Sequence, residues 1–340
     1  MTASIVQNAR RSADGAAMDF GRVAVVTGAN SGVGYHTARH LAARGATVVL
    51  ACRHPGRMAE AAASIRAAHP GAAVRQVTVD LGSLRSIRAA AHQILDDHAR
   101  IDVLVNNAGV MGVPRWDTLD GVEVHFGVNH LGHFALTGLL LPGLLSAPAA
   151  RIVTVSSTAH RAARLDPADW PNPRLYRAFR AYAASKLANL LFAYELHRRM
   201  TSAGVAARSI ASHPGWSDTK LIESAYRRGG PGVTVVGLRL LAAVVAQSAA
   251  LGALPTLAAA YADMPGGAYV GPRRWLHTRG PAAIERSSDD SHDEEAARLL
   301  WSMSAELSGV DPSSSLSAPR AGLGCVDVPG PVEGPPWRAR

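Results

Sequence analysis

The residues best suited to chemistry are a tyrosine and a lysine one helical turn apart. The segment AYAASKLAN places Tyr182 four residues before Lys186, on the same face of a predicted helix at Ala178–Met200. A phenol has a pKa of about 10 and is a poor proton donor near neutrality. A nearby ammonium stabilises the phenolate and lowers that pKa. The 35 basic residues of the chain include only two lysines, and the wide fork of an arginine would not replace this compact charge.

Three other segments bring polar groups to the same region. RIVTVSS at Arg151–Ser157 is an apolar strand that ends in two hydroxyls, and LVNNAG at Leu104–Gly109 ends another strand in small amide residues. Asn129 lies in a helical window, in HFGVNHLGHF. The carboxyl ends of strands form the edge at which open α/β sheets bind ligands, so these groups are predicted to meet near Tyr182.

A glycine-rich turn predicts a phosphate site. The first predicted strand runs into TGANSGVG at Thr27–Gly34, and a helix follows. Glycines at positions 28, 32 and 34 let the backbone turn sharply and approach an anion, while the helix N-terminus directs its amides at it. The spacing Gly-x3-Gly-x-Gly differs from the common Gly-x-Gly-x2-Gly fingerprint, and the Gly-Lys-Ser/Thr of a P-loop is missing.

The end of the second predicted strand favours NADP over NAD. An NAD site usually has an acidic residue there to hold the ribose hydroxyls. In VVLACRHPGR, Cys52 stands at that position, Arg53 follows and Arg57 comes one helical turn later. A guanidinium pairs with a 2′-phosphate, which an acid would repel.

The pattern of strands and helices predicts an α/β fold. Predicted strands lie at Val23–Thr27, Thr47–Ala51, Val74–Val79, Val103–Val105, Ile152–Val155 and Val205–Ile210. Predicted helices lie at Val33–Arg44, Gly56–Ala68, Ser83–Ala99, Thr118–Leu145 and Ala178–Met200. This alternation indicates a single-domain, Rossmann-type, doubly wound parallel sheet flanked by helices.

In the C-terminal third, the regular alternation of predicted strands and helices ends. We expect a helical substrate lid at about residues 211–262, a last short strand with its turn at Gly266–Pro272 and a closing helix at Asp293–Leu307. The catalytic domain is predicted to span residues 21–309, after a flexible N-terminal arm at 1–20 and before a disordered tail at 310–340.

Composition argues against several other classes of protein. The net charge is +9 and the pI about 10.2, but the arginines form no long basic run, which argues against nucleic-acid binding. The uncharged stretch Leu240–Ala262 is broken by Gly252 and Pro255, and predicts two buried helices rather than a membrane span. Two isolated cysteines form neither a disulfide framework nor a metal site, and residues 1–20 lack the apolar core of a signal peptide. We therefore expect a cytoplasmic protein.

Taken together, these motifs resemble the short-chain dehydrogenase/reductase family. The matching set comprises TGANSGVG, Asp80–Leu81, NNAG, Asn129, Ser156–Ser157, Tyr182-x3-Lys186 and Pro214–Gly215, in the family's order over roughly residues 22–310. The segments ACR, VSSTAH, SKLAN and HPGWSDT are similar to the branch of retinol dehydrogenases and protochlorophyllide-reductase-like enzymes.

The resemblance implies a role for each residue. Tyr182 would be the acid/base, Lys186 would hold the nicotinamide ribose and lower the pKa of Tyr182, Ser157 would bind the substrate oxygen, and Asn129 would position a water that links Lys186 to solvent. The residues expected to bind the cofactor, including Arg53 from the argument above, are Gly28, Asn30, Ser31, Gly32, Val33, Gly34, Arg53, Asp80, Leu81, Asn106, Asn107, Ala108, Gly109, Tyr182, Lys186, Pro214, Gly215, Trp216 and Thr219.

The expected function is an NADP-dependent interconversion of a carbonyl and an alcohol. The long connection from Ser157 to Tyr182 is interpreted as a flap over a fairly large apolar substrate, with packing against a neighbouring subunit as the alternative. Reduction of a C=C bond and non-catalytic sensing of NADP are the competing functions. The family commonly pairs subunits through the helices at Thr118–Leu145 and Ala178–Met200, so a homodimer or homotetramer is expected.

Overall fold

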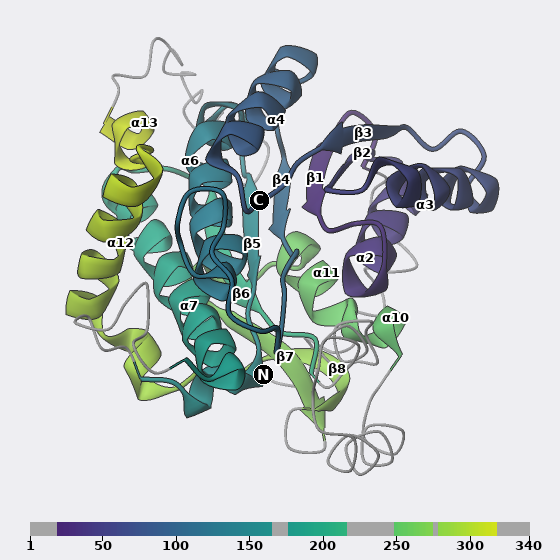
Figure 1. Ribbon diagram of the computed structural model, residues 1–340. Coiled ribbons are helices and arrows are strands. Elements are labelled where there is room, and N and C mark those ends of the chain that lie inside the picture. The colour runs from purple at the N-terminus through teal and green to yellow at the C-terminus, as the bar shows by residue number, and fades with distance from the viewer. Residues whose placement is uncertain (1–18, 165–175, 216–247, 275–277, 318–340) are drawn as a thin grey trace, which may run out of the picture.

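The structure is a computed structural model, and it describes residues 19–164, 176–215, 248–274 and 278–317 (Figure 1). The strands are β1 Val23–Thr27, β2 Thr47–Cys52, β3 Val74–Thr78, β4 Val103–Asn106, β5 Arg151–Val155, β6 Arg208–Ser212, β7 Tyr269–Arg274 and β8 Arg279–Ile284. The α-helices are α2 Gly32–Ala43, α3 Pro55–Ala68, α4 Leu84–Asp97, α5 Val124–Phe126, α6 Gly132–Leu145, α7 Ala178–Ser202, α10 Ala249–Gly252, α11 Leu254–Tyr261, α12 Glu294–Ser308 and α13 Ser313–Ser317. A π-helix, η1 Gly127–Leu131, joins α5 to α6, and two 3-10 helices are η2 Thr158–Ala162 and η3 Asp289–His292.

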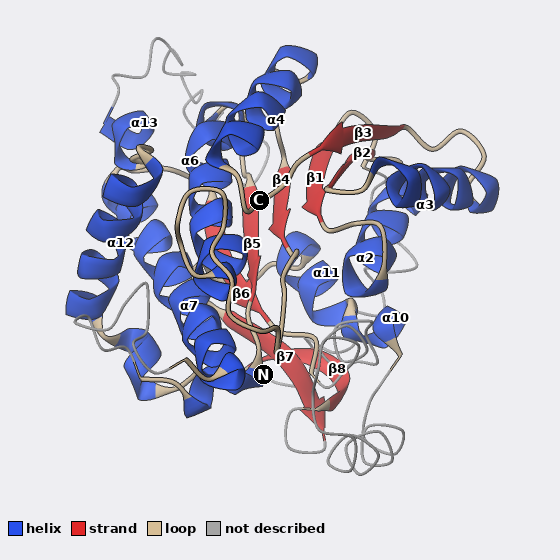
Figure 2. Cartoon of the chain, viewed as in Figure 1, coloured by secondary structure: helices blue, strands red, loops and turns tan. Residues whose placement is uncertain are grey.

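One twisted sheet runs through the middle of the molecule, between layers of helices (Figure 2). The strand order is β3-β2-β1-β4-β5-β6-β7-β8, and every pairing is parallel except that of β7 with β8. The order reverses direction between β1 and β4, so the loops after these strands diverge at the carboxyl edge. The predicted doubly wound α/β fold is confirmed.

Alternate residues of each central strand pack on opposite faces of the sheet. In β1, Val25 joins the core formed with α4 and α6, whereas Ala24 and Val26 join the core formed with α2, α3 and α11. Because both faces are covered, the strands are apolar throughout rather than alternating. The same burial fixes the register that brings the loops after β1, β4, β5 and β6 to one edge.

Two strand predictions differ from the structure. The predicted strand Val205–Ile210 begins only at Arg208, because the amide of Val205 bonds to the Met200 carbonyl (2.9 Å) and completes the end of α7. The strand predicted near Gly266–Pro272 becomes β7, and a further antiparallel strand, β8, lies beside it at the edge of the sheet. Its sequence, RGPAAI, contains the glycine and proline of a turn, and this edge position tolerates the proline.

Helices α6 and α7 are covered by other helices of the same chain. Both are buried on nearly all sides, and α12 and α13 lie against them within the same chain (Figure 1). Trp301 of α12 packs between Phe134 of α6 and Phe192 of α7, with ring centroids 5.1 and 6.0 Å away. The chain's own C-terminal helices therefore cover this face of α6 and α7, and the expected homodimer or homotetramer stays a prediction.

The ordered fold also extends beyond the predicted end of the domain at residue 309. Val310 is buried, and the Asp311 carboxylate accepts a hydrogen bond from Trp301 Nε1 at 3.1 Å. Ser313 begins α13 and accepts a hydrogen bond from Arg199 Nη1 at 2.8 Å. Residues 310–317 therefore belong to the packed fold, and the predicted tail can begin only after them.

Most of the predicted lid at residues 211–262 lies outside the described residues. Its described end forms α10 and α11, broken at Ala253 as the glycine and proline of this stretch predict. Among the described helices, only the stretch Val124–Leu145 has the length and hydropathy to cross a membrane, and 83% of that stretch's most apolar window is buried inside the protein.

Candidate functional site

Adjacent serines at the end of β5 point to different partners. Ser156 is buried and its hydroxyl donates to the Lys186 carbonyl at 2.7 Å, so it fastens α7 to the sheet. Ser157 is the N-cap of η2, its Oγ accepts a hydrogen bond from the Ala159 amide at 3.2 Å, and it lies close enough to the Tyr182 phenol to stabilise the phenolate. The structure thus places Ser157, the serine that the family resemblance implies, rather than Ser156 beside the tyrosine.

Lys186 lies inside the protein, one turn along α7 from Tyr182. Its side chain is 4% exposed, and Nζ donates to the Val155 carbonyl at 3.1 Å. Nζ stands 5.8 Å from the centre of the Tyr182 ring. Asn189 Nδ2 donates to the same carbonyl at 3.1 Å, so the end of β5 holds the lysine side of α7 from two positions.

The protonation of this pair differs from the simplest expectation. Burial lowers the pKa of Lys186 to about 8. Burial also raises the pKa of Tyr182, and the hydrogen bond from Ser157 opposes that rise. The predicted lowering of the Tyr182 pKa by Lys186 is not the dominant effect here, because desolvation outweighs a charge that is not in contact with the phenol oxygen.

Asn129 stands in the π-helix η1 and is fully buried. Its Oδ1 accepts from the Val110 amide (2.7 Å), and its Nδ2 donates to the Val110 carbonyl and to Ser185 Oγ (2.9 Å each). Ser185 in turn donates to the Tyr182 carbonyl at 2.7 Å. The side chain of Asn129 therefore ties the loop after β4 to the helix that carries the tyrosine.

Gly109 leaves open the space where Asn129 and Lys186 converge. A Cβ at this position would lie 3.1 Å from Asn129 Oδ1 and 3.6 Å from Lys186 Nζ. The structure thus brings together all four predicted catalytic residues, because Ser157 lies beside the Tyr182 phenol and both Asn129 and Lys186 lie next to this glycine.

The glycine-rich turn is fastened to the end of β4. Gly28 has φ +65° and Gly32 has φ +57°, which L side chains rarely adopt. A Cβ on Gly28 would lie 3.0 Å from Ala108, so the two loops approach closely. Asn107 Nδ2 donates to the Thr27 carbonyl at 2.8 Å, and the Asn107 and Ala108 amides donate to Thr27 Oγ1. These hydrogen bonds fix the shape of the turn, whose Asn30 and Ser31 precede the first residue of α2, Gly32.

The end of β2 carries an unopposed positive charge. Arg53 is exposed, and the described part of the chain offers it no carboxylate, its nearest contact being His54 Nε2 at 3.5 Å. Cys52 is buried against the backbone of the glycine-rich turn, and burial raises its pKa to about 11. A neutral thiol and a free guanidinium therefore stand where an NAD site has an acid.

The remaining predicted cofactor residues differ in where the structure places them. Asp80 Oδ1 accepts the Gly82 amide at 2.9 Å, and the neighbouring Leu81 is buried. Asn106 is fully buried and donates to Thr137 Oγ1 at 3.0 Å, so its side chain faces the interior and not the crevice. Pro214 and Gly215 follow β6 at the same edge of the sheet, whereas the predicted residues Trp216 and Thr219 lie outside the described residues.

Comparison with known proteins decides the family. The sequence pattern of the family described as short chain dehydrogenase matches residues 22–228. The chain belongs to the short-chain dehydrogenase family. It is therefore an oxidoreductase by family, as the motifs indicate.

Three relatives illustrate the match. Human retinol dehydrogenase 13 is 40% identical over 307 residues, which cover 88% of each chain. A crystal structure of an uncharacterised protein from Mycobacterium paratuberculosis is 40% identical, covers 88% of this chain and 97% of that one, and has a TM-score of 0.72. A short-chain dehydrogenase/reductase from Burkholderia phymatum, in complex with NAD, is 25% identical over 71% of this chain and 86% of its own, with a TM-score of 0.56.

Sequence analysis of this short-chain dehydrogenase missed a buried pair beside the tyrosine. His125 Nδ1 contacts Glu123 Oε1 at 2.7 Å, and both residues are buried. The ring of His125 lies edge-on to that of Tyr182, with 6.3 Å between centroids, and the Tyr176 hydroxyl lies 3.3 Å from its Nδ1. The signal available was the pattern Glu-x-His just before Asn129, which has no diagnostic spacing of its own.

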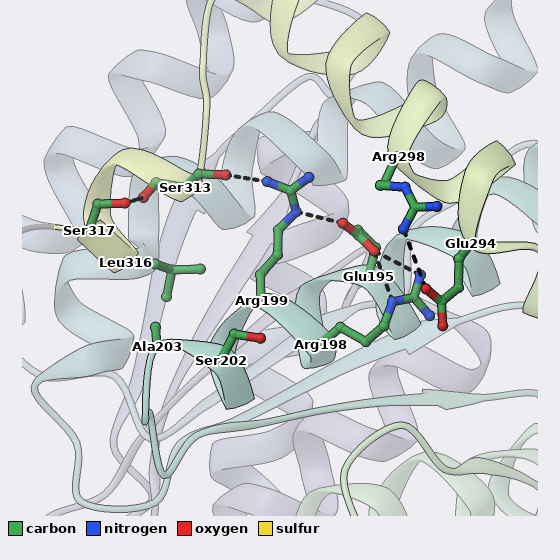
Figure 3. A pocket seen from close by; sticks show the side chains of 10 residues that line it. All are labelled: Glu195, Arg198, Arg199, Ser202, Ala203, Glu294, Arg298, Ser313, Leu316 and Ser317. Carbon is green, nitrogen blue, oxygen red and sulfur yellow. Dashed lines mark hydrogen bonds and ion pairs between the residues drawn. The ribbon is translucent and has the colours of Figure 1, made fainter.

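A polar hollow of about 500 Å³ lies away from this site (Figure 3). It is bordered by the end of α7, the start of α12 and α13, and its charges pair with one another. Arg198 and Arg199 both bind Glu195 at 2.7 Å, and Arg298 lies 3.4 Å from Glu294. Glu195 comes 13 residues after Tyr182 on the same helix, which corresponds to about 20 Å, so this hollow is not the catalytic crevice.

Proposed function

We propose that this short-chain dehydrogenase is an NADP-dependent oxidoreductase that interconverts a carbonyl and an alcohol on an apolar substrate. The observation that carries the proposal is that the Ser157 hydroxyl lies close enough to the Tyr182 phenol to stabilise its phenolate, with Lys186 buried one turn along α7. Two hydroxyls that meet at the carboxyl edge of the sheet can both donate to one substrate oxygen.

Each residue of the site has a different role in the reduction of the carbonyl. NADPH, when bound, supplies the hydride that adds to the carbonyl carbon. Ser157 and Tyr182 donate hydrogen bonds to the oxygen, which gains negative charge, and Tyr182 gives up its proton to complete the alcohol. Lys186, with its pKa near 8, is able to donate or accept a proton close to neutral pH. Asn129 keeps the helix of Tyr182 in register with the loop after β4 through Ser185.

The preference for NADP rests on the end of β2. Exposed Arg53 can bind a 2′-phosphate with two charge-assisted hydrogen bonds, and Arg57 lies in the first turn of α3. Among the described residues, no carboxylate forms an ion pair with Arg53, which contacts His54 Nε2 at 3.5 Å. The relative in complex with NAD shows that the family alone leaves the choice open, so these residues carry it.

An apolar alcohol or aldehyde is the proposed substrate class. The support is the 40% identity to a retinol dehydrogenase over most of both chains. The described wall of the site adds the aromatic rings of Tyr176 and His125 beside Tyr182. We also propose a cytoplasmic location, on the cysteine usage of the sequence.

The test is NADPH oxidation with a panel of aliphatic and polyene aldehydes, aromatic ketones, quinones and enones, with products identified by mass and chromatography. Alcohol formation supports the proposal, and NADH at equal concentration should be used less efficiently. Saturation of the enone C=C bond with no alcohol would favour a double-bond reductase. Tight NADPH binding without turnover of any member would favour a nucleotide sensor.

A further inference from the structure

A buried histidine stands directly behind the catalytic serine. His160, in η2, is fully buried, and its Nδ1 lies 2.6 Å from the Ser157 carbonyl. The amide of Ser288 donates to its Nε2 at 3.1 Å. An amide can only donate, so Nε2 must be the accepting nitrogen and the proton sits on Nδ1. That tautomer donates to Ser157, and burial keeps the ring neutral by lowering its pKa to about 4.

A second buried histidine holds the same C-terminal segment in the opposite tautomer. The Gly215 amide donates to His213 Nδ1 at 3.2 Å, so this nitrogen accepts and the proton is on Nε2. His213 Nε2 makes a short contact with Glu285 Oε1, and both groups are buried. Glu285 is thereby fixed three residues before Ser288.

Tyr269 of β7 packs between the two rings. It stacks on His213 with centroids 5.0 Å apart at 26°, and meets His160 edge-on at 5.5 Å and 86°. Its carbonyl also accepts the Glu285 amide at 2.9 Å. These contacts leave little freedom for either ring, because each is held by both hydrogen bonds and packing.

As a result, these hydrogen bonds restrict the orientation of the Ser157 hydroxyl. Its Oγ accepts the Ala159 amide and meets Tyr182, while its carbonyl is held by His160. Rotation of the Ser157 peptide would break the bond to His160. The Ser157 carbonyl also accepts the His160 backbone amide at 3.1 Å, and the ring of His160 ties this turn to a segment more than 120 residues later in the chain.

We propose that His160 is a positioning residue for Ser157, locked in its Nδ1–H tautomer by the Glu285–Ser288 segment. This inference rests on the proposed function, since it assigns a role within the same site. The C-terminal segment after β8 thus takes part in catalysis without contacting substrate, through His160.

The experiment is a double-mutant cycle in the full chain with NADPH and the best carbonyl of the panel. We expect H160F, which keeps an aromatic ring against Tyr269, to lower kcat about tenfold, a fraction of the roughly 10²-fold loss expected when a donor to the developing charge is removed. H160N keeps a donor near the Nδ1 position and should recover most of kcat, whereas H160Q should not. In an S157A background, H160F should cause no further loss of kcat.

The controls separate positioning from a general loss of stability. His197 lies on the far half of α7 against Gly267, and H197F should leave kcat unchanged. Each variant is compared at equal folded fraction, with NADPH Kd measured by fluorescence. Additive losses in H160F and S157A, or full kcat in H160F, would overturn the inference.

A readout that needs no turnover distinguishes this inference from the proposed function. The ¹⁵N chemical shifts of the His160 ring report which nitrogen carries the proton. We expect protonated Nδ1 and bare Nε2 from pH 6 to 8. A protonated Nε2 would overturn the inference while leaving the oxidoreductase proposal intact, and a wild type that turns over no carbonyl would overturn the proposed function instead.

Discussion

Replacing Arg53 with alanine tests the cofactor preference at the residue that determines it. Arg53 is exposed at the end of β2 and free of a carboxylate among its described neighbours. A hydrogen bond to a charged group contributes about 1.5–3 kcal/mol, and the lower end applies to an exposed side chain in high-dielectric surroundings. Because 1.4 kcal/mol is a tenfold change in affinity, R53A should raise the Kd of NADPH roughly 10- to 30-fold.

The same change should leave NADH binding almost unaltered, because NADH has no 2′-phosphate. Both dissociation constants can be measured by nucleotide fluorescence at fixed ionic strength, since exposed charges are screened by salt. R85A is the matched control: Arg85 is an exposed arginine on α4, on the other face of the sheet, and its loss changes the net charge equally.

The ratio of the two affinities decides the question. If R53A weakens NADPH and NADH alike, or weakens neither, the 2′-phosphate does not bind Arg53 and the argument from the end of β2 fails. A fall in NADPH affinity in R85A of the same size would point to a general electrostatic effect.

Three further predictions concern the site and its support. S157A should lower kcat about 10²-fold without a large change in stability. S156A should instead lose about 1 kcal/mol of unfolding free energy, because the Ser156 hydroxyl donates to the Lys186 carbonyl. Kinetics and urea denaturation of both variants test this, and equal effects of the two variants on kcat and on stability would refute it. Folding lowers the pKa of Lys186 from 10.5 to about 8, so the unfolded chain binds more protons between these pH values. The unfolding free energy of wild type relative to K186M should therefore rise from pH 8 to 10.5, measured by denaturant titrations. A flat difference would contradict the lowered pKa of the buried lysine. W301A should lower the unfolding free energy by about 3–5 kcal/mol and expose the apolar faces of α6 and α7. In light scattering, the wild type should not pair through these helices, whereas the variant should associate. An unchanged unfolding free energy would mean that α12 does not cover them.

Local sequence patterns predicted the centre of the fold well. β-branched runs located β1, β2 and β5 to within about one residue, since buried parallel strands need no alternation. The glycines of the phosphate turn and the one-turn spacing of Tyr182 and Lys186 depend only on nearby residues, so they too could be identified.

What could not be predicted depends on contacts between distant residues. Edge strand β8 was missed because RGPAAI reads as a turn until β7 is placed beside it. The covering of α6 and α7 follows from Trp301, whose partners lie over 100 residues earlier. His160 carries no sign in the sequence that Ser288 will bind it. The pKa of Tyr182 likewise follows from burial, which the spacing to Lys186 does not reveal.

The most direct measurement of the central claim is a comparison of Y182F with wild type in single-turnover reduction, with NADPH affinity determined on the same samples. The substitution removes only the hydroxyl that meets Ser157. We predict a fall in the rate of alcohol formation of about 10²- to 10⁴-fold, with NADPH Kd unchanged within about threefold. A variant that reduces the carbonyl at the wild-type rate would show that Tyr182 is not the proton donor, and would contradict the account of this site.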